Sequence, residues 1–350
     1  MICPHCQASL LRRERTDRTC AKCRRRFALD PKQGGSGFSD LRLRELVRRL
    51  TEDGRLAVTV EQLCYARERR RPGAQGPRPA RGRGRLVGSA LAVPVAAVLG
   101  VLAGTRGGPA ALVSGVAAAA VLLLSVLLLR RGPAGPAARP VRSDWTAESF
   151  RRSVLAPWRE VYGELPAGVV EREAVVPGPV PAEPVAALLC PDPAIGAFLH
   201  ANAFPQRHGV VLAAELRSVP PGLPLVVLHD ASPSGCLLVE QARAALPGRR
   251  IVDAGLPPRA LLEQPRAPRL REPGQARSEL ARLRAGGRLS AAELDWLDQG
   301  WWSPLAAARP ATVLAAAGRA VSRASAEDPA RTKRRALTVG FLTWPGEGAT

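Results

Sequence analysis

The sequence predicts a multidomain protein with a small N-terminal metal-binding domain, a two-helix transmembrane hairpin and a C-terminal α/β domain with a mostly parallel sheet. Three observations predict this fold class. Two Cys-x2-Cys pairs occupy the first 23 residues, two uncharged apolar runs lie at 86–104 and 109–129, and short apolar runs alternate with helical patterns after residue 169. The 350 residues suffice for two or three domains, and 46% of them are apolar, so a sizeable core can form.

The composition excludes a coiled coil, a collagen-like chain and a fully disordered chain. The chain is strongly basic, with 51 Lys and Arg against 30 Asp and Glu and a net charge of +21. Residues 1–85 carry 22 of these basic residues and nine acidic ones, a net charge of +13. This concentration favours an anionic neighbour, and the candidates are anionic inner-leaflet lipids, nucleic acid and an acidic protein.

The N-terminal cysteines have the spacing of a metal site. The pattern is C-x2-C-x13-C-x2-C, and its members are Cys3, Cys6, Cys20 and Cys23. Each pair can direct two thiolates at one ion, and two pairs complete a tetrahedral all-sulfur shell. Over about residues 1–30 this pattern resembles the zinc-ribbon family, which implies a zinc-ribbon domain at 1–33 and a structural Zn²⁺ held by these four thiolates. Rubredoxin-like iron sites usually have Gly after each pair, whereas Gln7 and Arg24 stand here, which favours zinc.

A small helical segment is expected at 38–71, followed by a basic Pro/Gly/Arg linker at 72–85. Ser39 or Asp40 can cap a helix that continues to about residue 50. A short strand and a second helix are expected after it, before the linker begins.

The two apolar runs at 86–104 and 109–129 predict a transmembrane hairpin over 86–129. They contain 19 and 21 residues without charge, and each run spans roughly 30 Å as a helix, the thickness of the hydrocarbon core. Arg residues flank the hairpin in the linkers 72–85 and 130–142, so the positive-inside rule places both termini in the cytoplasm. The sequence therefore predicts a two-span protein of the inner (plasma) membrane, with the lipid bilayer as a partner.

Two further features of the predicted hairpin bear on its partners and relatives. Small residues recur at every fourth position in both runs, which makes a homodimer a candidate. The order of zinc ribbon, two-span hairpin and α/β domain resembles uncharacterised actinobacterial membrane proteins. That resemblance implies no known activity.

Residues 143–350 are expected to form a cytoplasmic α/β domain. It begins with a helix at 143–162, and its strands are predicted at 186–189, 210–213, 225–228 and 251–252. Helical patterns near 195–203 and 236–246 separate these runs, which indicates parallel pairing. Further helices are expected within 275–325, and the run 337–344 is expected to add an edge strand.

The ends of the predicted strands carry a candidate ligand pocket. Its residues are Asp192, Asp230, Ser232 and Gly235. The segment from Asp230 to Gly235 resembles the D-x-D-x-x-G motif of Toprim nucleotidyl-transfer domains, which implies a Mg²⁺ site. Ser232 stands in place of the second Asp, and the upstream strand lacks the family's Glu. A single carboxylate is a poor ligand set for Mg²⁺, so the alternative is an ordinary turn in which Asp230 or Ser232 caps the next helix.

No catalytic residue is assigned by the sequence, because no nucleophile elbow, phosphate-binding loop or histidine metal spacing is present. The leading hypothesis is a non-enzymatic inner-membrane protein that acts in protein interaction or scaffolding, with an unidentified protein partner. The alternatives are a membrane-tethered nucleic-acid-binding protein and a divergent Toprim-like Mg²⁺-dependent enzyme.

Overall fold

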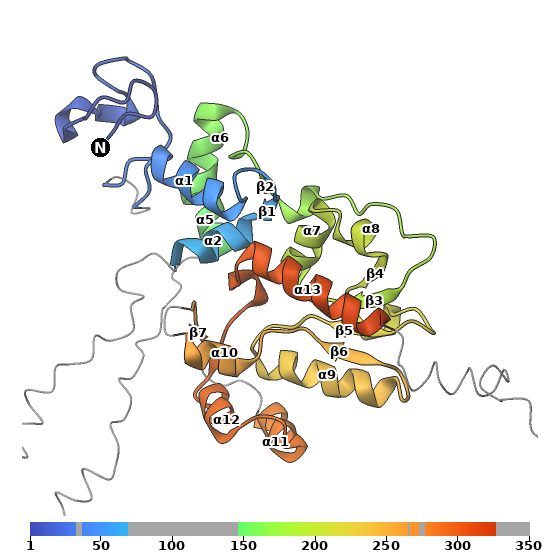
Figure 1. Cartoon of the computed structure of the whole chain (residues 1–350). Coiled ribbons are helices and arrows are strands. Elements are labelled where there is room, and N and C mark those ends of the chain that lie inside the picture. The colour runs from blue at the N-terminus through green and yellow to red at the C-terminus, as the bar shows by residue number, and fades with distance from the viewer. Residues whose placement is uncertain (33–36, 69–145, 265–266, 273–276, 327–350) are drawn as a thin grey trace, which may run out of the picture. The chain divides into compact units, whose positions relative to one another are not determined.

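The structure is a computed structural model that describes residues 1–32, 37–68, 146–264, 267–272 and 277–326 (Figure 1). The chain divides into two compact units, Met1–Arg70 with Val141–Thr350 and Arg71–Pro140. All described residues belong to the first unit, and only that unit is considered below.

A four-stranded parallel sheet forms the centre of the C-terminal region. Its strands are β3 (Ala186–Leu189), β4 (Val210–Ala213), β5 (Leu225–Val227) and β6 (Ile251–Asp253). The order is β4-β3-β5-β6, and every neighbouring pair is parallel. The predicted α/β domain with a mostly parallel sheet is confirmed. These strands read as continuous Ala, Leu and Val runs because both faces of the sheet are covered.

Helices cover the two faces of this sheet and use alternate residues of each strand. Ala186 and Leu188 of β3 join the core formed with α7 (Pro193–Ala201), α8 (Phe204–His208) and α13 (Pro310–Ser325). The intervening Ala187 and Leu189 join the opposite core, which contains α9 (Pro233–Ala245). In Figure 1, α13 and α9 lie on either side of the strands. This division follows from the two-residue period of side chains along a strand.

The segment between β6 and α13 forms a smaller helical layer. Its elements are α10 (Pro258–Glu263), β7 (Leu270–Arg271), α11 (Arg277–Gly286), α12 (Ala291–Asp298), β8 (Trp301–Trp302) and η7 (Leu305–Ala307). β7 and β8 pair antiparallel, and Trp296 and Trp301 lie in a shared core with Leu237 of α9. The sequence indicated helices in this region, but not this antiparallel pair.

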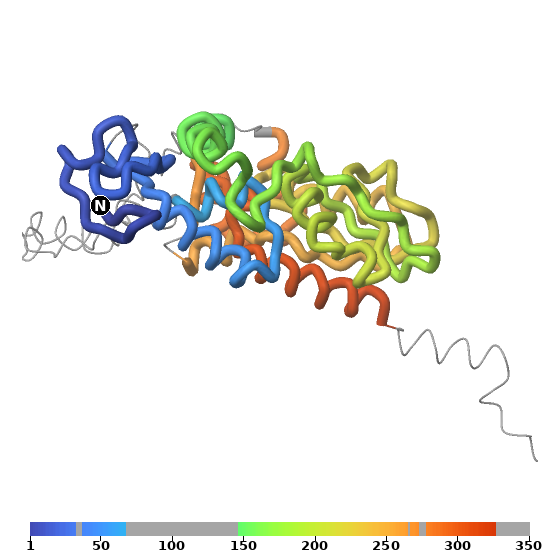
Figure 2. The backbone as a smooth tube through the Cα atoms, turned by 90° about the horizontal axis from the view of Figure 1, so that it is seen from above, coloured from blue at the N-terminus to red at the C-terminus, as the bar shows by residue number. Residues whose placement is uncertain are grey.

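Residues on both sides of the undescribed segment 69–145 share one hydrophobic core. The elements before it are α1 (Asp40–Leu50), β1 (Val58–Thr59) and α2 (Val60–Glu68). Those after it are α5 (Ala147–Phe150), the π-turn η4 (Arg151–Leu155), α6 (Ala156–Tyr162) and β2 (Val169–Val170). β1 pairs parallel with β2, and Leu43, Phe150 and Trp158 are buried together. In Figures 1 and 2 the blue segment of α1 and α2 lies beside the green segment of α5 and α6.

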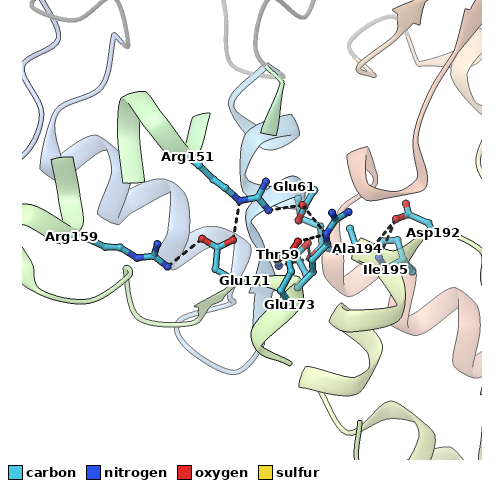
Figure 3. Close-up of polar contacts among 11 residues, drawn as sticks. Thr59, Glu61, Arg151, Arg159, Glu171, Glu173, Asp192, Ala194 and Ile195 are labelled. Atoms are coloured by element: carbon cyan, nitrogen blue, oxygen red, sulfur yellow. Dashed lines mark hydrogen bonds and ion pairs between the residues drawn. The ribbon is translucent and has the colours of Figure 1, made fainter. Parts of the chain in front are cut away.

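An ion-pair network reinforces this junction (Figure 3). Arg151 contacts Glu61 of α2 at 2.8 Å and Glu171, which follows β2, at 2.9 Å. Arg159 of α6 also contacts Glu171, at 3.2 Å. Because the side chains of Arg151, Glu61 and Glu171 are largely buried, water screens these pairs less than it screens surface pairs.

The predicted transmembrane hairpin and the inner-membrane localisation with both termini in the cytoplasm are corrected by the structure. Within the described residues, no helix has the length and apolar character needed to cross a bilayer. The longest described helix, α13, has 16 residues and carries Arg319 and Arg323. It spans about 24 Å, against a hydrocarbon core of about 30 Å. The hairpin at 86–129, both linkers (72–85 and 130–142) and the run 337–344 lie outside the described residues.

Candidate metal centre

The four N-terminal cysteines lie together with their sulfur atoms at metal-ligand spacing. Their Sγ atoms are all within 4.8 Å of one another. Cys3 Sγ lies 3.8 Å from Cys23 Sγ, and Cys6 Sγ lies 3.9 Å from Cys20 Sγ. Tetrahedral coordination with metal–sulfur bonds of about 2.3 Å separates the ligand atoms by about 3.8 Å. The side chains therefore stand where one tetrahedral ion would hold them.

Each Cys-x2-Cys pair forms a tight turn, here called a knuckle. The N–H of Gln7 donates to Cys3 O at 3.1 Å in the first knuckle, and the N–H of Arg24 donates to Cys20 O at 2.7 Å in the second. Gln7 and Arg24 both have a φ of 58°, in the left-handed region that favours glycine. Side chains at such positions cost about 1 kcal/mol each, a local cost that a metal ion bound between the knuckles would offset.

The surroundings of Cys3 and Cys20 shift the pKa values of the two thiols in opposite directions. Burial raises the pKa of the Cys3 thiol to about 11. Burial acts in the same direction on Cys20, but hydrogen bonds from the backbone N–H groups of Cys23 and Lys22 outweigh it and lower its pKa to about 7. A cation among the four sulfurs would relieve both the burial cost and the mutual repulsion of the thiolates.

The four cysteines can therefore hold a metal ion, and their sulfur atoms are sufficient for it without ligands from other side chains. Among the residues that the structure describes, they are the one group of three or more His, Cys, Asp or Glu side chains with such geometry. His5 lies within the first knuckle but is not part of this group, and its Nε2 atom contacts the carbonyl oxygen of Arg26 at 2.8 Å.

Asp40 of α1 links residues 1–30, here called the metal-binding region, to α1 and α6. This carboxylate is fully buried and accepts hydrogen bonds from the N–H groups of Ala28 at 2.9 Å and Leu29 at 2.7 Å. The hydroxyl group of Tyr162 on α6 donates to the same carboxylate. Burial and this hydrogen bond raise the pKa of Tyr162, so its hydroxyl stays protonated. Ser39, not Asp40, caps α1, and Asp40 is left free for these contacts.

Glu160 of α6 forms a second, exposed link to the same region. It contacts Arg26 at 2.7 Å and Arg18 at 3.5 Å. The hydrogen bond from Arg26 and the charge of Arg18 lower the pKa of Glu160. Because Glu160 and Arg26 are exposed and Arg18 is half-buried, the pairs orient the two parts more than they stabilise them.

The candidate pocket residues at the strand ends serve mainly to cap helices. Asp192 accepts hydrogen bonds from the N–H groups of Ala194 at 2.9 Å and Ile195 at 3.3 Å at the start of α7 (Figure 3). Ser232 accepts from Gly235 N at 3.0 Å at the start of α9 and donates to Asp230 Oδ1 at 2.6 Å.

Asp192 and Asp230 follow the neighbouring strands β3 and β5, between which the strand order reverses. Burial, and to a smaller extent the charge of Asp230, raise the pKa of Asp192. A Cβ atom added to Gly235 would lie 2.2 Å from Asp230 Oδ1, so this turn requires glycine. In the described part of the chain, no third carboxylate completes a metal-binding group with them.

The buried side chain of His229 contacts Asp253 at the same edge of the sheet, and the sequence analysis did not predict this pair. His229 Nδ1 lies 2.7 Å from the carbonyl oxygen of Asp230, and Nε2 lies 3.1 Å from Asp253 Oδ1. Both acceptors lack a proton, so the two contacts are those of a protonated ring in which both nitrogens donate. The one available signal was that His229 follows β5 and Asp253 ends the adjacent strand β6.

Replacing Asp253 with Asn is expected to destabilise the protein at low pH more than at high pH. Burial alone would lower the pKa of His229, but the hydrogen bond and charge of Asp253 raise it above 6.5. The stability that this pair contributes is therefore fully present below about pH 6.5 and is lost as pH rises through the folded-state pKa. Urea unfolding at pH 5.5 and 8.5 should show a difference of about 1 kcal/mol at the lower pH only. An equal difference at both pH values would contradict the imidazolium assignment.

No protein-family model matches the chain, and no curated protein or solved structure matches it either. The function is therefore inferred from the residues themselves. The two features that carry chemistry are the closed set of four thiols and the charge of the surface around it.

Proposed function

We propose that Cys3, Cys6, Cys20 and Cys23 bind one structural Zn²⁺, and that the protein acts without catalysis as an interaction or scaffold protein. The observation that supports this is the arrangement of the sulfurs, which lie within 4.8 Å of one another. Four protein ligands fill a tetrahedral shell and leave no position for a substrate or an activated water molecule. In this proposal the metal holds the shape of a surface that a partner recognises.

A structural metal suits the metal-binding region because its hydrophobic core is too small to stabilise the fold. Its small core contains Leu10 and Phe27 beside Cys3 and Cys20. A domain with so few buried apolar side chains depends on its metal for stability. Gln7 and Arg24, which stand where rubredoxin-like iron sites usually have Gly, also favour zinc over iron.

Nucleic-acid binding is a second candidate function, favoured by the charge of the metal-binding region. Five basic side chains are exposed there and form no ion pair with the described residues: Arg12, Arg13, Lys22, Arg24 and Arg25. Three of them lie in or directly after the second knuckle, so the metal would hold them together. A metal-stabilised cluster of cations is the kind of surface that contacts phosphates.

One comparison of variants tests both proposals. The experiment is a pull-down from a cell extract, analysed for both proteins and nucleic acid. The full chain serves as bait in three forms: wild type, Cys20→Ala/Cys23→Ala, and Lys22→Ala/Arg24→Ala/Arg25→Ala. An interaction protein keeps a protein partner in the wild type and the cation variant and loses it in the cysteine variant. A nucleic-acid-binding protein retains nucleic acid at moderate salt in the wild type alone.

Arg282→Ala is the matched control, because this exposed arginine lies on α11, away from the metal-binding region. It should behave as the wild type does. A catalytic turnover that requires Asp230 would contradict the non-catalytic assignment. A cysteine variant that binds everything the wild type binds would remove any role for the metal in binding.

A further inference from the structure

A groove with a volume of about 930 Å³ lies on the α/β region, formed by α8, α13 and the turn after α1. Its floor is apolar and includes Leu56, Phe204 and Leu314. The groove shares no residue with the four cysteines or with the candidate pocket at the strand ends (Asp192, Asp230, Ser232 and Gly235). Its occupant is therefore a separate one from any ligand of those two sites.

The α13 wall of the groove has the spacing of a helix-packing seam. The groove is lined by Ala311, Ala315, Gly318 and Ser322, which are separated by four, three and four residues. This is the a/d spacing along which one helix packs on another, and the small side chains of Ala311 and Ala315 allow a close approach. A Cβ atom on Gly318 would lie 3.1 Å from His208 Cε1, so His208 already covers that position. The opposite side of α13 is already occupied, because Val313, Ala317 and Ala320 are buried against the sheet.

The rim of the groove is positively charged. Arg207, Arg319 and Arg323 line it, and the one carboxylate beside them is Glu52. Arg319 and Arg323 are both exposed and lie one turn apart on α13. Within the described ranges, no carboxylate pairs with either of them. Burial and the charge of Arg207 lower the pKa of His208, so this side chain is neutral at pH 7 and the net charge of the lining is +2.

Two other occupants fit this surface less well. A second copy of the chain would bring the same arginines against this rim, and like charges at an interface repel. A small ligand needs polar groups that converge inside its pocket, whereas here the arginines and Ser322 are exposed. A seam of small side chains flanked by charge is instead the pattern on which an amphipathic helix lies.

We infer that this groove binds an acidic amphipathic helix of a partner protein. The apolar side of that helix packs along Ala311 and Ala315, and its Asp or Glu side chains pair with Arg319 and Arg323. From Ala311 to Arg323 the wall is about 18 Å long, which corresponds to three turns of helix. The inference does not depend on the metal site or on the function proposed for it.

The test uses the full chain and a labelled synthetic peptide of about three heptads, with Leu or Ala at a and d and Glu at e and g. Fluorescence anisotropy should show saturable binding to the wild type. Arg319→Glu/Arg323→Glu should weaken that binding by about tenfold or more. The same peptide with Lys in place of Glu should show the reverse preference and bind only the charge-reversed variant.

Two further variants separate a specific site from general attraction to a basic chain. Arg282→Glu changes an exposed arginine on another helix and should leave the affinity unchanged. Ala315→Phe places a large side chain on an exposed position of the seam and should abolish binding without unfolding the protein.

Three results would overturn the inference. One is equal binding of the acidic peptide to the wild type and the charge-reversed variant. Another is an equal loss of binding with Arg282→Glu, which would indicate attraction to net charge alone. The third is an occupant of another kind: self-association of the chain, or binding of dodecanoate, that Ala315→Phe abolishes while the acidic peptide does not bind.

Discussion

Replacing Cys20 and Cys23 with Ala is expected to remove the bound metal and unfold residues 1–30, while the sheet and its helices remain folded. The cysteines are half of the ligand set, and the core around them contains only two large apolar side chains, Leu10 and Phe27. Structural Zn²⁺ sites contribute about 10–16 kcal/mol of apparent binding free energy at pH 7, which such a core cannot replace. This is the largest effect that the structure predicts.

Hydrogen exchange measures this result directly. In the wild type, the amides of Cys3 and Cys20 donate to Ala8 O at 2.9 Å and Arg25 O at 3.1 Å and should be protected. In the double variant, that protection should disappear, while the amides of β3 and β5 keep theirs. Cys236→Ser is the control, because this partly buried thiol lies outside the cluster. Preserved protection of the knuckles in the double variant would contradict a metal-dependent fold.

Replacing Asp40 with Ala is expected to lower the free energy of unfolding by about 3–5 kcal/mol. The substitution leaves the N–H groups of Ala28 and Leu29 and the hydroxyl of Tyr162 without their acceptor in a buried site. Tyr162→Phe removes one donor and leaves the other two bonds intact, so it should cost only about 1 kcal/mol. Urea unfolding of the two variants gives both values.

Asp298→Ala is the matched control for this prediction. Asp298 is exposed and pairs with Arg284 at 3.3 Å, so its loss should change the free energy of unfolding by less than about 0.5 kcal/mol. If Asp40→Ala were as mild as this control, Asp40 would not connect the metal-binding region to α6.

Local patterns in the sequence predicted the features that depend on local spacing. The Cys-x2-Cys pairs indicated that Cys3, Cys6, Cys20 and Cys23 lie together, because a short turn sets the distance between two thiols. The strands β3, β4, β5 and β6 were found at nearly their observed bounds, since each is a short apolar run between turns. Of the two residues that the alternative interpretation offered as caps for the next helix, Asp230 and Ser232, it is Ser232 that caps α9.

Long-range contacts were beyond the sequence patterns. Glu61 and Arg151 are separated by 90 positions, and no periodicity indicates that they form an ion pair. The same holds for Asp40 and Tyr162, and for His229 and Asp253, whose pairing depends on strand order. The transmembrane prediction was wrong: it rested on hydropathy and the flanking charges alone, and none of the described helices is long and apolar enough to cross a bilayer.

The most direct test of the central claim is the metal content of the full chain, purified without added metal. The closed four-cysteine site predicts one zinc ion per chain and four thiols that become reactive only after the metal is removed. Cobalt exchanged into the site should show the absorption of a tetrahedral cobalt–thiolate complex. A chain that contains iron, or that contains no metal and joins these cysteines in disulfides, would contradict the account.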